Sequence, residues 1–398
     1  MDAINKTNFE AGFYRTIAPI ILSVLCVYLT IGMTLGILPG YVEDHLKLNS
    51  IWVGIIIGMQ AMATLLTRAY AGKRTDIKGA KSSSRLGGYL GVLTGFLYLT
   101  SVLLSSKVFL ALALAIASRV LHGISESLLV TGSLTWGIGL VGQKKSGKVM
   151  TWNGIAMYAG ISLGAPLGIA LNKTLNIESV FCVIALFSAL SLIATHKLPA
   201  WMADLKHIRT PFYKVVGKIS VQGLGLAFSS IGFACISSFI VLFYVQKQWE
   251  NASHAFMCFG GFYILVRLFF SSFPDKYGAY RVALISLSIE VIGQLLIGFS
   301  ISKSMALIGC CLTGAGFSLI FPSLGVIAIK KVPAQMRGTA LGAYGAFFDL
   351  SLGIAAPIAG LVASWFDYQS VYLFGGISCI LAILVLFISK NDSHSFEG

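Results

Sequence analysis

Hydrophobic side chains occur along this chain in long unbroken runs and do not alternate with polar ones. Runs such as 86–105 and 369–389 supply about the 20 apolar residues that a helix needs to cross a bilayer. Strands of a transmembrane β-barrel alternate polar and apolar residues in short segments, so a barrel is disfavoured. The pattern predicts twelve membrane-spanning helices, over 16–41, 51–72, 86–105, 108–140, 149–171, 179–195, 218–245, 254–272, 282–301, 305–329, 339–364 and 369–389.

The composition supports an all-α polytopic membrane protein. Of the 398 residues, 56% are hydrophobic and 11% are charged, and the mean hydropathy is +0.84. A soluble domain carries roughly a quarter of charged residues, so a globular soluble domain and a disordered chain are both excluded. The spans leave room only for short loops, with no large soluble domain.

The distribution of positive charge predicts the topology. With the N-terminus inside, 21 of the 29 Lys and Arg residues fall in cytoplasmic segments, and three lie within spans. Only five fall outside: Lys47, Lys107, Lys173, Lys247 and Lys303. This bias places both termini in the cytoplasm. The net charge of +14 is therefore a topology signal that does not require nucleic acid, and contact with anionic lipid stays open.

The chain carries no motif of an enzyme or of a cofactor site. Its seven cysteines lie in or beside apolar runs, without the spacing of metal ligands. No Walker loop, HExxH or GxSxG pattern is present. We therefore expect no enzymatic activity, no metal and no cofactor, and we expect a monomer.

An internal repeat divides the chain into halves. Three residue types recur at a single offset of 199 residues, which is half of 398: Arg68, Asp76 and Gly79, then Arg267, Asp275 and Gly278. The repeat predicts two pseudo-symmetric six-helix bundles, over 1–196 and 218–398, and transporters of this build bind substrate between their halves. The polar segment 197–217 is a linker, either an interfacial helix or a plain tether.

The loop after the second span carries a family resemblance. Its pattern Gly72-x-x-x-Asp76-x-x-Gly79-x-Lys81 resembles the signature loop of the major facilitator superfamily, although Ile77 stands where a basic residue is usual. The resemblance implies the fold of that superfamily in a bacterial inner membrane, with transport by alternating access.

Two further segments resemble a bacterial subgroup of sugar-efflux-like permeases. They are Gly123–Gly137 in the fourth span, preceded by Arg119, and Tyr344–Gly353 in the eleventh span. Related exporters of the superfamily handle siderophores and other metal chelators. The resemblance implies a small-molecule substrate and does not identify it.

The fourth span contains candidate residues for the mechanism. Arg119, His122 and Glu126 have the spacing i, i+3 and i+7, which places them on one helical face. Ionisable groups within a bilayer are functional candidates by default. We expect Arg119 to bind substrate and His122 and Glu126 to serve proton coupling. The alternative is a buried structural ion pair.

Other spans contribute further candidates. Asp349, near the middle of the eleventh span, is expected to couple protons or, alternatively, to bridge two helices. Glu290 is expected to have a structural partner. Tyr28, Asn153 and Gln222 are expected to contact substrate, although the sequence does not show which way each side chain faces.

The repeated loops are candidates for a cytoplasmic gate. The resemblance implies that such an aspartate holds the gate shut at the start of the eleventh span, whereas the alternative is ordinary loop capping. The expected gate residues are Arg68, Gly72, Asp76, Gly79, Lys81, Arg267, Asp275 and Gly278.

These observations predict a proton-driven secondary transporter of a small polar or anionic solute. Efflux by proton antiport is the first expectation, because 160–168 resembles the glycine–proline motif of antiporters. The alternatives are a proton symporter that imports a sugar, an organic acid or an iron chelate, and a membrane sensor without transport.

Overall fold

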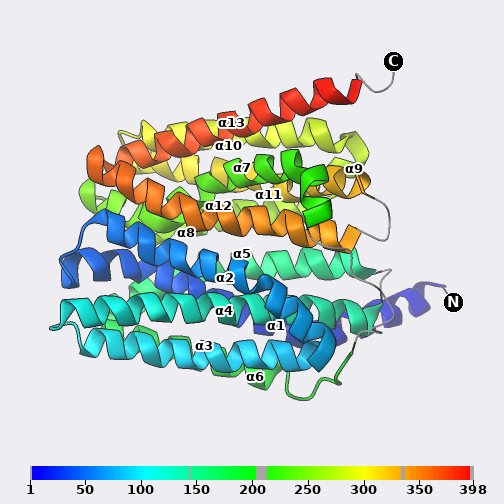
Figure 1. Cartoon of the computed structure of the whole chain (residues 1–398), viewed down its shortest axis with the longest axis horizontal. Coiled ribbons are helices and arrows are strands. Elements are labelled where there is room, and N and C mark those ends of the chain that lie inside the picture. Colours follow the sequence, from blue (N-terminus) through cyan, green and yellow to red (C-terminus); the bar gives the residue numbers. More distant parts are fainter. Residues whose placement is uncertain (1, 143–144, 203–212, 333–336, 395–398) are drawn as a thin grey trace. The chain divides into compact units, whose positions relative to one another are not determined.

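The computed structural model describes residues 2–142, 145–202, 213–332 and 337–394, and every regular element in these ranges is helical (Figure 1). The elements are α1 (Asp2–Gly40), the π-helical turn η1 (Tyr41–His45), α2 (Ser50–Lys78), α3 (Ala80–Leu103), α4 (Val108–Val141), α5 (Ser146–Thr174), α6 (Ile177–Ala194), α7 (Tyr213–Gln246), α8 (Ser253–Phe270), α9 (Phe273–Tyr277), α10 (Ala279–Gly298), α11 (Lys303–Lys330), α12 (Arg337–Trp365) and α13 (Tyr368–His394).

The described part of the chain contains twelve helical segments that are long and apolar enough to cross a membrane. They correspond one to one with the predicted spans, so the predicted fold class is confirmed. The short helix α9 is an addition that the hydrophobic pattern does not reveal. It follows α8 directly and begins with a proline near its N-terminus, where the missing amide hydrogen costs nothing.

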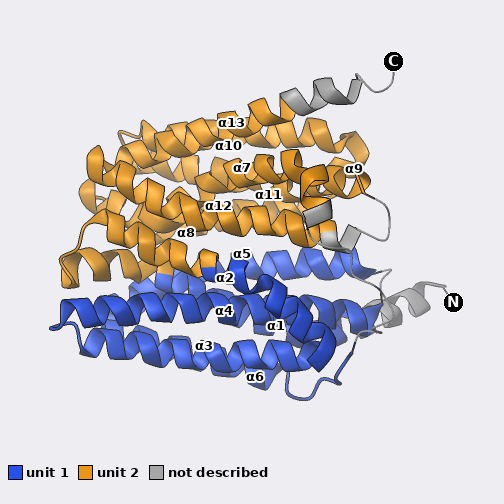
Figure 2. Ribbon diagram, viewed as in Figure 1, with its two compact units in different colours: residues 1–34, 63–207 blue, residues 35–62, 208–398 orange. Residues whose placement is uncertain are grey.

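The chain divides into two compact units (Figure 2). Unit 1 comprises Met1–Thr34 and Ala63–His207, and unit 2 comprises Leu35–Met62 and Ile208–Gly398. The C-terminal end of α1, the turn η1 and the first half of α2 thus group with the second half of the chain. The bundle boundaries expected from the repeat, at 196 and 218, stay a prediction about the two halves.

Glycine contacts hold unit 1 together. α3 and α4 run side by side (Figure 1), and an added Cβ at Gly87 would lie 2.7 Å from the backbone of Ser125. At Gly164 of α5, an added Cβ would lie 2.3 Å from the Leu29 carbonyl oxygen of α1. Small residues let helices approach this closely inside a membrane. Close packing is therefore what the glycine-rich segment of α5 provides.

Glycines also explain why residues 35–62 belong to unit 2. Gly54 of α2 lies against the backbone of α12, where an added Cβ would be 2.3 Å from the Ala356 oxygen. The Ser50 hydroxyl donates to the Gly360 carbonyl at 3.3 Å. Tyr368 donates a hydrogen bond to the carboxyl group of Glu43. The first half of α2 thus packs against α12, and η1 contacts the start of α13.

The segment after α6 folds back over unit 1. The Trp136 indole of α4 donates to the Pro199 carbonyl at 2.9 Å, and the Ala80 amide donates to the Trp201 carbonyl at 3.2 Å. Residues 203–212 of the predicted linker lie outside the described residues. Both interpretations of that linker, the interfacial helix and the tether, therefore stay hypotheses.

The two repeated loops have the same backbone conformation. Gly79, between α2 and α3, has a φ of +86°, and Gly278, between α9 and α10, has a φ of +90°. Residues with a Cβ rarely adopt such angles, so glycine is required at both turns. The shared geometry supports the internal repeat seen in the sequence.

Candidate functional site

A polar stripe runs along α4 within unit 1. Arg119 is 2% exposed and His122 is 1% exposed, whereas Glu126 is half-buried. The three side chains share one helical face, as their spacing predicts. A guanidinium, an imidazole and a carboxyl group therefore lie within about two turns of a membrane-spanning helix.

Two hydroxyl groups of α1 contact Arg119 and His122 of this stripe. The Arg119 guanidinium donates to the Thr34 hydroxyl at 3.0 Å, and the His122 Nε2 atom lies 3.0 Å from the Thr30 hydroxyl. Thr30 and Thr34 are both fully buried and are one helical turn apart. The face of α1 that meets α4 therefore presents two threonine hydroxyls to the stripe.

Glu126 joins three helices. Its Oε1 atom accepts a hydrogen bond from the Tyr28 hydroxyl of α1 at 2.7 Å. Its Oε2 atom accepts one from the Thr64 hydroxyl of α2 at 3.1 Å. An ionised carboxylate only accepts hydrogen bonds, whereas a protonated one also donates. The carboxyl group of Glu126 therefore links α4 to α1 and to α2.

An aromatic side chain of α3 packs against His122 of the stripe. The rings of Tyr98 and His122 meet edge to face with centroids 6.4 Å apart, and Tyr98 stacks on Phe181. The His122 Nδ1 atom is buried without a hydrogen-bond partner among the described residues. Asn153 of α5 donates to the Met157 sulfur at 3.3 Å, and its Oδ1 atom also lacks a described partner.

Asp349 and Gln222, predicted for proton coupling and substrate binding, belong to unit 2. Asp349 of α12 is 5% exposed, and Gln222 of α7 is 1% exposed. The structure therefore gathers Tyr28, Arg119, His122 and Glu126 within unit 1, and it places Asp349 and Gln222 in the other unit.

Glu290 of α10 has a structural partner of the kind expected. The Ser229 hydroxyl of α7 donates to its Oε2 atom at 2.6 Å, and the residue is fully buried. The Cys379 thiol lies beside the carboxyl group. Gln294, one turn further along α10, donates to the Gly232 carbonyl at 3.2 Å and to the Thr313 hydroxyl at 3.3 Å. These polar groups join α7, α10, α11 and α13.

The predicted gate residues lie at the two repeated turns and on the helices that flank them. The Lys81 ammonium donates to the carbonyls of His196 and Leu198, at 3.0 and 2.5 Å, and so fastens α3 to the segment after α6. Arg267 donates to the Ser318 carbonyl of α11 at 2.9 Å, a partner outside its own loop. Arg68, Gly72 and Asp76 lie on the last turns of α2, and Asp275 lies in α9. Their gating role stays a prediction.

Metal ligands do not gather in the part of the chain that the structure describes. No group of three or more His, Cys, Asp or Glu residues there could hold a metal ion. Thr30 and Thr64 are the partners of the α4 stripe that sequence reasoning missed, whereas Thr34 was among the polar residues that could line a cavity. Hydroxyl residues are common on many faces of these spans, so the sequence offers no signal that selects Thr30 or Thr64.

The comparisons with known proteins agree with this architecture. A family model described as the Major Facilitator Superfamily matches residues 20–215 and 222–396. The chain belongs to the Major Facilitator Superfamily. This superfamily consists of membrane transporters rather than enzymes, so the chain is a multi-pass transporter.

Curated relatives match over almost the whole length. The chain is 38% identical over 386 residues to an uncharacterized MFS-type transporter of Salmonella typhimurium, covering 97% of this chain and 98% of the relative. It is 39% identical over 375 residues to the uncharacterized MFS-type transporter YhhS of Escherichia coli K12, covering 94% and 92%. A relative from Pseudomonas aeruginosa PAO1 is 41% identical over 374 residues, covering 92% of each chain.

Solved structures share the fold at low sequence identity. The nucleoside transporter NupG has a TM-score of 0.76 at 15% identity, covering 94% of this chain and 99% of that one. A D-xylose–proton symporter has a TM-score of 0.75 at 15% identity, covering 93% and 97%. The human organic anion transporter MFSD10 has a TM-score of 0.73 at 18% identity, covering 94% and 99%.

Proposed function

We propose that this transporter exports a small polar or anionic solute across the bacterial inner membrane by proton antiport. Both termini are then cytoplasmic, and the proton gradient supplies the energy. One observation carries the proposal: the buried stripe of Arg119, His122 and Glu126 on α4, hydrogen-bonded to hydroxyl groups of α1 and α2.

Arg119 supports an anionic or strongly polar substrate. A charged side chain near the centre of a membrane helix costs about 2.5–3.5 kcal/mol on insertion scales. This cost is offset where the charge binds a substrate or pairs with another group of the protein. The Arg119 guanidinium can offer a planar pair of donors to a carboxylate or a phosphate. Tyr28, Asn153 and Gln222 are proposed to supply neutral hydrogen bonds to the same solute.

Glu126 and Asp349 are the proposed proton sites, with His122 as a neighbour that shares the α4 stripe. Coupling requires a group whose proton affinity differs between the two states of the transporter. Glu126 meets the structural requirement, because its two oxygens accept bonds from two different helices. Movement of α1 or α2 would remove a donor and change the affinity for a proton.

The export direction is supported by α5. Its segment Gly160–Gly168 resembles the glycine–proline motif of antiporters, and Pro166 lies inside the helix. The glycines of this segment lie against the backbone of α1, the helix that carries Tyr28, Thr30 and Thr34. A change in α5 packing would thereby reach the donors of the proposed substrate site.

The test is substrate-dependent proton movement in proteoliposomes, with a panel of sugars, organic acids, nucleosides and iron chelates. The variants are Arg119→Ala, Glu126→Gln and Asp349→Asn. The matched control is Asp367→Asn, because Asp367 caps α13 by accepting from the Ser370 amide at 2.7 Å, and asparagine caps equally well.

We expect one solute class to drive proton movement in the opposite direction. Arg119→Ala should abolish binding of that solute. Glu126→Gln or Asp349→Asn should leave binding intact and abolish proton movement, whereas Asp367→Asn should change neither. Proton movement in the same direction as the solute would establish symport instead. A rate of solute transport that does not depend on the pH gradient would overturn proton coupling.

A further inference from the structure

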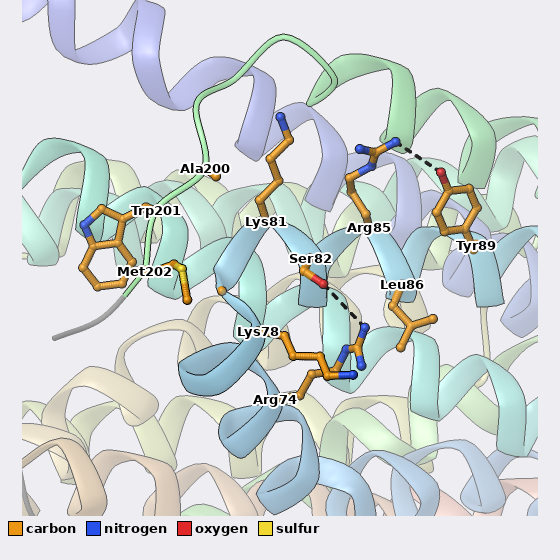
Figure 3. Close-up of a pocket in the computed structure, with 11 residues that line it drawn as sticks. Arg74, Lys78, Lys81, Ser82, Arg85, Leu86, Tyr89, Ala200, Trp201 and Met202 are labelled. Carbon is orange, nitrogen blue, oxygen red and sulfur yellow. Dashed lines mark hydrogen bonds between the residues drawn. The ribbon is translucent and has the colours of Figure 1, made fainter. Parts of the chain in front are cut away.

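A basic pocket lies at the turn between α2 and α3 (Figure 3), and its lining includes no residue of the α4 stripe. Its volume is about 520 Å³. The last turns of α2, the first turns of α3 and the segment after α6 form its walls, and all three belong to unit 1. Gly79, with its positive φ, forms the corner where the two helices meet.

Four cationic side chains line this pocket without a carboxylate among its lining residues. Arg74 and Lys78 come from α2, and Lys81 and Arg85 come from α3. Asp76, the acidic residue nearest in sequence, is not part of the lining. Like charges around one cavity repel one another, and the repulsion grows as water is displaced. An anion in the pocket would turn this repulsion into attraction.

The two arginines keep donors available for such an anion. Arg74 donates to the Ser82 hydroxyl at 3.5 Å, and Arg85 donates to the Tyr89 hydroxyl at 3.2 Å. Each of these contacts uses only the Nη2 atom of its arginine. A guanidinium has five N–H groups in a fork that matches the oxygens of a phosphate. The arginines can therefore bind a phosphate while they keep the contacts shown in Figure 3.

An apolar stripe continues from the pocket along α3. Tyr89, Leu93 and Phe96 are 53%, 48% and 55% exposed. Their spacing of i, i+4 and i+7 puts them on one face of a helix that is long and apolar enough to span the membrane. Trp201 and Tyr89 at the pocket are aromatic residues of the kind enriched at the membrane–water interface.

We propose that this pocket binds the phosphate of an anionic glycerophospholipid in the cytoplasmic leaflet, with an acyl chain along Tyr89, Leu93 and Phe96. Basic pockets on the cytoplasmic side are suited to anionic headgroups. The exposed apolar stripe selects a lipid over a soluble phosphate, because only a lipid covers both surfaces. The proposal rests on the cytoplasmic orientation and does not depend on what is transported or in which direction.

Binding is measured on the purified full-length protein in detergent by native mass spectrometry, with phosphatidylglycerol and phosphatidylcholine as probes. The pocket variant is Arg74→Gln with Arg85→Gln. The control is Lys73→Gln with Lys331→Gln, which removes the same charge from two exposed lysines outside the pocket. A third variant, Arg74→Lys with Arg85→Lys, keeps the charge and removes the guanidinium forks.

We expect the wild-type protein to prefer phosphatidylglycerol. The pocket variant should weaken that binding roughly thirtyfold. Each positive charge near an anionic headgroup contributes about 1 kcal/mol of binding free energy, and the variant removes two charges. The lysine variant should fall between the pocket variant and the wild type, and the control should bind as the wild type does. Equal weakening by the pocket variant and the control would indicate general surface attraction and overturn the site.

A second arm separates a lipid from a soluble phosphate. Glycerol phosphate and inorganic phosphate are titrated while thermal unfolding is followed. If either one stabilises the wild-type protein as strongly as phosphatidylglycerol does, the pocket is a soluble-phosphate site and the lipid assignment is wrong. Phe96→Ala should weaken phosphatidylglycerol and leave glycerol phosphate unchanged. No transport assay enters these measurements, so their failure would leave the proposed function untouched.

Discussion

Replacing Tyr28 with phenylalanine removes one hydroxyl group and leaves the aromatic packing in place. That hydroxyl donates to Glu126 at 2.7 Å, between α1 and α4, and Tyr28 is 4% exposed. Interhelical hydrogen bonds in membrane proteins contribute about 0.6 kcal/mol on average and about 1.7 kcal/mol at most. Because this bond is short, partly buried and directed to a carboxyl group, we expect a loss of about 1–1.7 kcal/mol.

The loss should depend on the acceptor, because the Glu126 carboxyl group is the partner of that hydroxyl. In a Glu126→Gln background the cost of Tyr28→Phe should be smaller, since the hydroxyl has then already lost its carboxyl acceptor.

The assay is reversible denaturant unfolding in mixed micelles, analysed as a double-mutant cycle over Tyr28→Phe and Glu126→Gln. Tyr372→Phe is the control, since the Tyr372 hydroxyl is buried without a hydrogen-bond partner among the described residues. That control should cost nothing. A coupling energy near zero, which means an equal loss in the Glu126→Gln background, would refute the assigned bond.

Three further predictions concern packing and backbone. Gly164→Leu should destabilise the protein by about 1–3 kcal/mol, because an added Cβ has no room beside α1. Gly147 lies on the same helix and has no atom within 4 Å of an added Cβ, so Gly147→Leu should be tolerated; thermal unfolding compares the two variants. Ser229→Ala should cost more in the wild-type protein than in a Glu290→Ala background, as a double-mutant cycle would show, because the serine donates to that carboxyl group. Gly278→Ala should cost about 1–2 kcal/mol, because its positive φ disfavours a side chain although nothing lies within 4 Å of an added Cβ, and the shift in the denaturant midpoint measures the loss.

The hydrophobic pattern alone predicted all twelve spans, because a span depends on the length of an apolar run and little else. The face shared by Arg119, His122 and Glu126 was equally predictable, since helical spacing determines it. The glycine turns followed from the repeat, because the same residue types recur where the chain reverses. These properties are local, or repeat at a fixed offset.

Partners across helices were out of reach. Thr30, Thr34 and Thr64 are ordinary hydroxyl residues in apolar spans, and nothing local shows that they meet the α4 stripe. The Arg267 contact with Ser318 joins positions 51 residues apart, so its own loop could not reveal it.

The sequence by itself determined the membrane-spanning class, the number of spans, the repeated turns and the residue types on each helical face. Only the tertiary structure decided which faces meet. Glycines allow close backbone contact between particular helices, such as α5 with α1 and the first half of α2 with α12, and the sequence does not show which helix each glycine will contact. The basic pocket shows the same division. Its cations are visible in the sequence, but the segment after α6 must fold back onto α3 before they enclose a cavity.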